Sequence, residues 1–148
     1  MAMVWLLVPV LLAAYVLWLL PPSRGRVTPV LDAQGMPLAG SIAEKVFVQI
    51  GGARQGMFLR GSDASKPVLL LVHGGPGMPD YFLARAHRST LENHFVVCYW
   101  EQRGCGISFA AGREPSVMVV ARFVQDVLEV TDYLRTRFGQ AKITLMGH

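Results

Sequence analysis

The residues most suited to chemistry lie in a glycine-rich stretch from Leu71 to Pro79 (LVHGGPGMP). Glycine lets backbone N–H groups face a ligand with no side chain in between. Fixed N–H donors stabilise the negative charge that develops on a carbonyl oxygen when an ester or amide is hydrolysed. A phosphate-binding loop is the rival interpretation, but no Gly-Lys-Ser/Thr sequence follows. We therefore expect an oxyanion-stabilising loop formed by His73, Gly74, Gly75, Pro76 and Gly77.

A second loop with polar residues follows the next apolar run and contains Glu101, Gln102, Arg103 and Gly104. Its charged residues could contact a substrate, but we favour an ion pair or backbone hydrogen bonds that brace the loop, because buried charges are paired. Asp126 carries the same ambiguity. We expect Cys105 to be a packing residue, because the sequence shows no basic partner for it. His73 is expected to seat its loop through a backbone contact and not to transfer a proton.

The two loops together resemble a known family. HGGPG at residues 73–77, followed by WEQRGCGIS at residues 100–108, is similar to the proline iminopeptidase branch of the α/β-hydrolase superfamily. The resemblance implies an oxyanion hole that uses the N–H of Gly75, with Gly74 as second choice, and a Pro76 that shapes the loop. The sequence departs from the family pattern at Glu101, where aspartate is usual, and at Ile107, which is commonly polar or basic.

The final residues, ITLMGH at 143–148, resemble the strand that leads into the nucleophile elbow of this family. In the G-x-S-x-G elbow, Gly147 would be the first glycine and His148 the residue before the serine. The resemblance places the serine, a cap domain, the acid and the histidine after His148. We therefore expect an acyl-enzyme hydrolase of esters, lactones or N-terminal peptide bonds, inactive as this chain alone. The alternatives are half of a split hydrolase or a non-catalytic membrane-bound fragment, either paired with a complementary C-terminal partner chain.

The elements that must position these loops follow from apolar patterning. Residues 44–50 and 55–60 alternate around Gly51-Gly52 and predict a β-hairpin. Two continuous apolar runs, 67–72 and 95–100, predict strands buried on both faces, with a short helix over 81–91 between them. Helical spacing of apolar residues predicts a long helix over 116–138, with Ser116 as N-cap and Gly139 as C′ residue, and residues 142–146 begin another strand. The pattern predicts an α/β fold with a mostly parallel sheet. The resemblance implies that this is the N-terminal half of an α/β-hydrolase fold.

The first twenty residues are mostly apolar and carry no charge. A helix of this length can span a bilayer. We expect a transmembrane anchor over 1–20, a linker over 21–40 and a partial hydrolase domain over 41–148. A cleaved signal peptide, with export, is the alternative, but no basic residue precedes the run and no clear cleavage site follows it. Arg24 and Arg26 follow the run, which favours a single-pass protein with its folded part in the cytoplasm.

The charge and cysteine content exclude several other classes. The net charge of +4 is small and its basic residues are scattered, which argues against nucleic-acid binding. Cys98 and Cys105 are too few for a disulfide framework or a CxxC metal site, and no metal-ligand spacing joins the histidines. We expect no metal or other cofactor, and a small acyl or peptidyl molecule as substrate.

Overall fold

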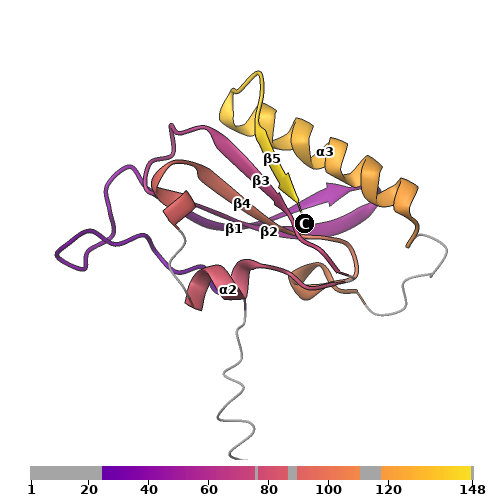
Figure 1. Ribbon diagram of the computed structural model, residues 1–148, viewed down its shortest axis with the longest axis horizontal. Coiled ribbons are helices and arrows are strands. Elements are labelled where there is room, and N and C mark those ends of the chain that lie inside the picture. Colours follow the sequence, from indigo (N-terminus) through magenta and orange to yellow (C-terminus); the bar gives the residue numbers. More distant parts are fainter. Residues whose placement is uncertain (1–24, 76, 87–89, 111–117, 148) are drawn as a thin grey trace, which may run out of the picture.

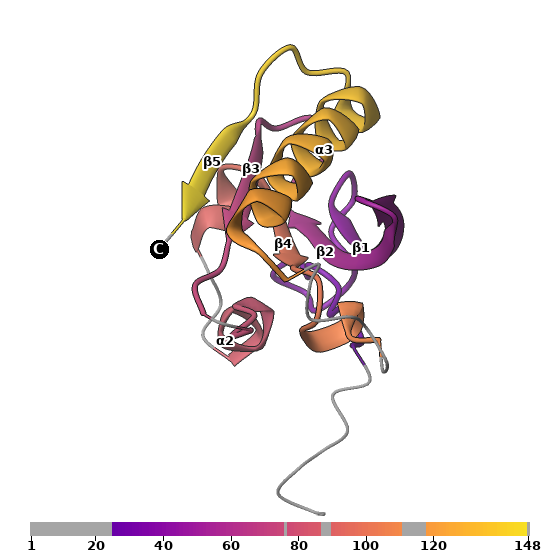
Figure 2. The same cartoon turned by 90° about the vertical axis from the view of Figure 1, so that its right-hand side faces the viewer.

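The computed structural model describes residues 25–75, 77–86, 90–110 and 118–147. They form a sheet with helix α3 against one face and helix α2 against the other (Figures 1 and 2). The strand order is β1-β2-β4-β3-β5. In chain order the elements are β1 (Ile42–Ile50), β2 (Ala53–Gly61), β3 (Val68–Val72), α2 (Tyr81–Ala86), the 3₁₀ turn η1 (Thr90–Asn93), β4 (Val96–Glu101), the 3₁₀ turn η2 (Gly106–Ser108), α3 (Val120–Phe138) and β5 (Thr144–Gly147).

The predicted hairpin is confirmed. β1 and β2 pair antiparallel, and Ile50 lies opposite Ala53 across a two-residue turn. Gly51 and Gly52 have φ of 54° and 70°, the left-handed values that such a tight turn requires. β2 also pairs antiparallel with β4, so the sheet is mixed, and the prediction of a mostly parallel sheet was wrong at this point. The hairpin adds its second strand directly to the parallel part of the sheet.

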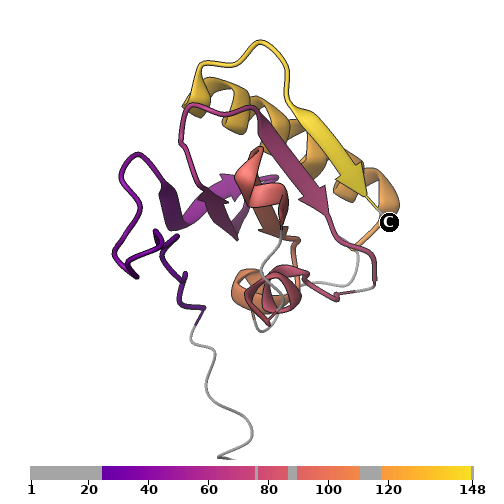
Figure 3. The same cartoon turned by 60° about the vertical axis from the view of Figure 1, so that its left-hand side comes forward.

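The two continuous apolar runs form the centre of the sheet, as predicted. β3 lies between β4 and β5 and is parallel to both. Figure 3 shows β5 running beside β3 in the same direction. Alternate residues of these strands enter two separate cores. The core under α3 includes Met57, Leu59, Leu70, Cys98, Trp100, Val130 and Leu134, whereas the core under α2 includes Phe58, Leu69, Leu71, Tyr81, Val97 and Tyr99.

Helix α3 differs from its prediction at the N-terminal end. It begins at Val120, and the N-cap position belongs to Val119, so Ser116, which lies outside the described residues, is not the cap. Its fully buried residues are Asp126, Val130 and Leu134, spaced four apart, whereas Val120 is 79% exposed. The core-facing stripe therefore includes a carboxylate that apolar periodicity does not reveal. At the other end Gly139 has φ of 62° and caps the helix, as predicted.

Helix α2 is shorter than predicted and ends at Ala86. Tyr81 is its only buried residue, so little packing supports a longer helix. Residues 87–89 lie outside the described residues, and η1 begins at Thr90. Through Tyr81, the helix packs on the face of the sheet opposite α3 (Figure 2).

The N-terminal part is only partly described. The predicted anchor over 1–20 lies outside the described residues, and among the helices within them none is long and apolar enough to cross a membrane. Within the predicted linker, Leu31 and Pro37 form an isolated bridge across a turn at Asp32. Val27 packs on the core under α2, and the N–H of Thr28 donates to the Tyr81 hydroxyl at 3.2 Å. The segment from residue 25 onward therefore contacts the folded domain.

Candidate active site

The two loops singled out in the sequence lie side by side, joined through His73 and Gln102. The side-chain amide of Gln102 donates to the backbone oxygen of His73 at 2.7 Å, and the backbone N–H of Gln102 donates to Nε2 of His73 at 3.1 Å. Nδ1 of the same ring is 2.9 Å from the carbonyl oxygen of Gly74. Because Nε2 accepts a hydrogen bond, the proton of the neutral ring belongs on Nδ1, where it donates to Gly74. Nε2 of His73 therefore joins the two loops, and Nδ1 braces the glycine-rich loop itself.

The joined loops surround a cavity of about 430 Å³. Its wall includes backbone of Gly74, Gly75 and Gly77, the second loop from Gln102 to Cys105, and two apolar side chains from the α3 end, Met118 and Phe123. The loop is tight: a Cβ added at Gly75 would lie 2.6 Å from the backbone nitrogen of Gly77. Gly77 has φ of 77°, which also favours glycine. Pro76, between them, lies outside the described residues.

Cys105 lies nearer to a basic group than the sequence indicated. Its sulfur is 3.3 Å from Nε2 of His73 and 3.0 Å from the carbonyl oxygen of Gln102. Burial, followed by the negative charge of Glu101, raises the pKa of the Cys105 thiol to about 12. The lone pair of His73 is already shared with the N–H of Gln102. The thiol is therefore neutral near pH 7 and is not an activated nucleophile.

Glu101 and Arg103 do not pair with each other, and each braces the second loop through a different interaction. Oε2 of Glu101 accepts the backbone N–H of Ile107 at 2.5 Å, at the start of η2. The backbone oxygen of Glu101 accepts from the Ser108 hydroxyl, whose oxygen accepts the N–H of Gly56 at 2.7 Å. Glu101 thus braces its own loop through backbone groups, and Ser108 ties that loop to β2. Ser108 is the last residue of the second family-like motif, but the sequence analysis predicted no role for it.

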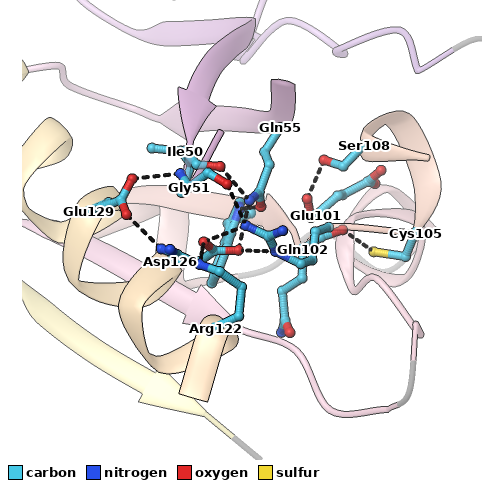
Figure 4. A network of polar contacts seen from close by, with 12 residues as sticks. Ile50, Gly51, Gln55, Glu101, Gln102, Cys105, Ser108, Arg122, Asp126 and Glu129 are labelled. Atoms are coloured by element: carbon cyan, nitrogen blue, oxygen red, sulfur yellow. Dashed lines mark hydrogen bonds and ion pairs between the residues drawn. The ribbon is translucent and has the colours of Figure 1, made fainter. Parts of the chain in front are cut away.

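Arg103 instead pairs with Asp126 of α3. Its Nε and Nη2 atoms are 2.5 Å and 2.7 Å from the two oxygens of Asp126, a bidentate ion pair with both side chains buried. Nη2 also donates to the carbonyl oxygen of Gly51 in the hairpin turn at 3.2 Å. Figure 4 shows Asp126 at the centre of these polar contacts, between α3 and the hairpin. The second loop is thereby attached to both the helix and β1-β2.

Two further side chains complete the partners of Asp126. Gln55 donates its amide to Oδ2 at 2.8 Å and accepts the indole N–H of Trp100 at 3.0 Å. Arg122 donates to Oδ1 at 2.9 Å from the same helix. Gln55 was not a candidate in the sequence, because a single polar residue in an alternating strand gives no sign that it is buried. In this structure it links the centre of the sheet to the ion pair.

The carboxyl end of β5 lies beside the carboxyl end of β3, where the glycine-rich loop begins. Gly147, the predicted first residue of the elbow, pairs with Val72, which directly precedes His73. A Cβ added at Gly147 would lie 3.4 Å from the carbonyl oxygen of Val72, a close but sterically allowed contact. His148 lies outside the described residues. Among the described residues, no three His, Cys, Asp or Glu side chains lie close enough to hold a metal ion.

Comparisons with known proteins agree with this architecture. Residues 67–148 match the family model described as alpha/beta hydrolase fold. The chain is 35% identical over 113 residues to the probable aminopeptidase YbaC of Bacillus subtilis (strain 168), an alignment that covers 76% of this chain and 36% of the relative. It is 30% identical over 88 residues to the proline iminopeptidase of Lactobacillus crispatus (strain ST1), covering 59% of this chain and 28% of the relative.

A solved structure also resembles this chain and is related to the proline iminopeptidases. The crystal structure of a proline iminopeptidase-related protein from Thermus thermophilus superimposes with a TM-score of 0.58 at 31% identity, covering 72% of this chain and 36% of that protein. Epoxide hydrolase structures match at 23% identity, which supports the fold alone. In these alignments the chain spans about a third of the length of its relatives. The chain belongs to the α/β-hydrolase fold family and is similar to the proline iminopeptidases within it.

Proposed function

We propose that this chain supplies the oxyanion-stabilising part of a serine-type hydrolase that cleaves esters, lactones or N-terminal peptide bonds through an acyl-enzyme. The observation that carries the proposal is the joined pair of loops, with backbone of Gly74 and Gly75 lining a cavity at the carboxyl ends of β3 and β4. Relatives named as aminopeptidase and proline iminopeptidase support the N-terminal peptide bond among these substrates.

The chemistry follows from the position of the loop. In an acyl transfer, the carbonyl oxygen gains negative charge as the nucleophile attacks, and nearby N–H groups lower the energy of that state. Gly75 supplies one donor in this proposal, and the residue after the nucleophilic serine supplies the other. The serine would follow His148, next to the loop, because Gly147 already lies beside Val72. His73 and Gln102 would hold the donor in place.

A fusion protein tests this proposal. Residues 1–148 are joined to the part of the Bacillus subtilis relative that follows its matched segment, and hydrolysis of proline β-naphthylamide and p-nitrophenyl acetate is measured. We expect turnover and labelling by a fluorophosphonate. Gly75→Pro removes the donor N–H, and its ring also crowds the backbone nitrogen of Gly77. It should lower kcat by at least about 10²–10³-fold, the usual effect of losing one oxyanion donor.

A glycine far from the loop provides the matched control. Gly139→Asn keeps the left-handed cap of α3, where no atom lies within 4 Å of an added Cβ, and should leave kcat unchanged. Near-ultraviolet circular dichroism checks that each variant is folded. A folded Gly75→Pro fusion with unchanged kcat would assign the donor elsewhere, and a fusion that neither turns over substrate nor labels would contradict the hydrolase proposal.

A non-catalytic role in binding a partner chain is the second candidate, and the surface around β5 supports it. All four residues of β5 are exposed, and Leu145 is 52% exposed. On α3, Val120, Val124 and Leu128 form an exposed apolar row at a spacing of four. Such a surface suits a complementary C-terminal hydrolase half that extends the sheet.

Co-expression of this chain with the C-terminal half of the Bacillus relative, followed by gel filtration, tests this role. The two should elute as a complex that Leu145→Glu weakens, and separate elution would contradict the role.

Membrane attachment is a proposal from the sequence alone. The apolar, uncharged residues 1–20 support a single transmembrane anchor with the folded part in the cytoplasm. Carbonate extraction of cell membranes tests it: the chain should stay in the pellet, and a chain that begins at residue 21 should be released. Protease protection of residues 25–147 in intact spheroplasts, with digestion after lysis, checks the orientation.

A further inference from the structure

A second cavity, of about 580 Å³, shares no lining residue with the cavity between the two loops. It lies on the α2 side of the sheet, between α2, η2 and β2. Its apolar wall includes Phe58, Tyr81, Phe82 and Ile107, and its charged residues are Glu101 and Arg85. The volume is in the range of small-molecule sites, which are mostly apolar with a few placed polar groups.

The carboxylate of Glu101 is only partly satisfied by the protein. Glu101 is 7% exposed, and one oxygen, Oε2, accepts the N–H of Ile107. Oε1 has no hydrogen-bond partner within the part of the chain that the structure describes. Burial raises the pKa of this carboxyl above its usual value, against the opposing hydrogen bond from Ile107. A buried carboxylate of this kind gains stability from a cation that reaches its free oxygen.

The apolar wall of the cavity contains a stacked pair of aromatic rings. The rings of Phe58 and Tyr81 are stacked with centroids 3.8 Å apart and an interplanar angle of 14°, and both side chains are buried. The hydroxyl of Tyr81 accepts the N–H of Thr28, which fixes the ring from the side of the N-terminal segment. Phe82, on the next position of α2, is half exposed and lines the cavity. An apolar body placed here loses water-exposed surface against preformed rings.

Arg85 adds the opposite charge to the lining of the same cavity. It lies in the last turn of α2 and is exposed, and none of the ion pairs among the described residues includes it. A simple cation at Glu101 would be repelled by Arg85, and a simple anion at Arg85 would be repelled by Glu101. A molecule that carries both a positive and a negative charge can pair with both residues.

From this juxtaposition we propose that the cavity binds a free α-amino acid with an apolar side chain. Its ammonium group donates to Oε1 of Glu101, its carboxylate accepts from the guanidinium of Arg85, and its side chain packs on the rings of Phe58 and Tyr81. The proposal is independent of the hydrolase function, because it needs neither the glycine-rich loop nor a nucleophile. It assigns a role to Glu101 and Arg85 that bracing of η2 does not explain.

Binding of L-phenylalanine to the full chain in detergent micelles tests this, measured by isothermal titration calorimetry. N-acetyl-L-phenylalanine lacks the ammonium, and L-phenylalaninamide lacks the carboxylate. We expect saturable binding of L-phenylalanine, and each analogue should bind about tenfold or more weakly, since each loses a charge-assisted hydrogen bond. Equal binding of L-phenylalanine and its N-acetyl form, or no saturation at millimolar concentrations, overturns the proposal.

Two variants identify the groups on the protein. Glu101→Gln keeps an oxygen for the N–H of Ile107, so η2 remains braced, and should abolish the preference for L-phenylalanine over its N-acetyl form. Arg85→Gln should abolish the preference over L-phenylalaninamide. Asp132→Asn, on the exposed side of α3, is the charge-matched control and should change neither. If Glu101→Gln does not fold, the analogue series on the unaltered chain still decides; a folded variant with both preferences intact overturns the assignment.

Discussion

Two buried carboxylates on opposite faces of the sheet have very different surroundings. Asp126, on the α3 side, accepts hydrogen bonds from Arg103, Arg122 and Gln55. Glu101, on the α2 side, accepts only the N–H of Ile107 with its carboxylate oxygens, among the described residues, and borders a cavity. Asp126 is fully buried and Glu101 nearly so. Similar burial thus accompanies three side-chain partners for the carboxylate of Asp126 and one backbone partner for that of Glu101.

The difference in hydrogen-bond partners suits Asp126 to a structural role and Glu101 to the proposed ligand binding. A buried charge with cationic partners and filled hydrogen bonds fixes the geometry around it, and here it holds the second loop against α3. A buried carboxylate with a free oxygen stores a desolvation cost that a ligand can offset. Asp126 binds Arg103 of this loop on the α3 side, whereas Glu101, at the start of the loop, borders the second cavity on the α2 side. Substitutions at each carboxylate test this contrast.

The largest effect is expected for Asp126→Ala. The substitution leaves Arg103 buried without its counter-ion, and breaking a buried pair in this way costs about 3–5 kcal/mol. Urea denaturation of the full chain, followed by far-ultraviolet circular dichroism, measures the loss in the free energy of unfolding. Asp132→Ala, which removes an exposed ion pair with Arg135, is the control and should cost about 0–1 kcal/mol. Equal losses would show that Asp126 does not hold the loop.

A smaller loss is expected for Gly106→Ala. The φ of Gly106 is 44°, and an added Cβ would overlap Oε2 of Glu101. Gly139→Ala provides a matched control, because its φ of 62° is also left-handed but no atom lies within 4 Å of the new Cβ. Gly106→Ala should lower the free energy of unfolding by roughly 1–3 kcal/mol more than Gly139→Ala, the usual cost of overpacking.

A double substitution identifies the cause of that extra loss. In a Glu101→Ala background the clash at Gly106 disappears, so Gly106→Ala should then cost about as much as Gly139→Ala. The non-additivity is the measured quantity in a double-mutant cycle. An unchanged penalty in the Glu101→Ala background would mean that the carboxylate does not approach Gly106 as the structure shows.

The smallest effect concerns pH and Glu101. Burial raises the pKa of Glu101 above 4.5 in the folded chain, so the folded state binds this proton more tightly than the unfolded state. The free energy of unfolding therefore falls as pH rises from 4.5 through the raised pKa, and this fall is absent in Glu101→Gln. The stability of Glu101→Gln relative to the unaltered chain should increase with pH and then level off.

Asp63 provides a control of opposite sign. Hydrogen bonds from Ser65 lower the pKa of Asp63 below 3.8, so its contribution to stability is present above pH 3.8 and is lost as pH falls through the lowered pKa. Asp63→Asn should therefore remove a stabilisation at neutral pH that acid removes from the unaltered chain. Urea titrations at a series of pH values measure both. A Glu101→Gln curve with the sign of the Asp63→Asn curve would contradict the burial of Glu101.

The apolar pattern alone was sufficient for the centre of the fold. The runs ending at Val72 and Trp100 became adjacent parallel strands, because only a strand covered on both faces tolerates such continuous apolarity. From that pairing it follows that the loops after them, starting at His73 and Glu101, lie at one edge of the sheet. Gly139 was also identified correctly, because a helix end that needs left-handed φ favours glycine whatever packs around it.

The pairing of buried polar side chains could be seen only in the tertiary structure. Trp100 and Glu101 are neighbours in the chain, but side chains alternate along a strand, so the indole enters the α3 core and the carboxylate the α2 side. Asp126 lies 23 residues from Arg103 and 71 from Gln55, and their contact depends on where α3 crosses the sheet. Apolar periodicity reports which face of an element is buried. The partner of a buried charge depends on register and helix placement, which are set only when the sheet and helices pack together.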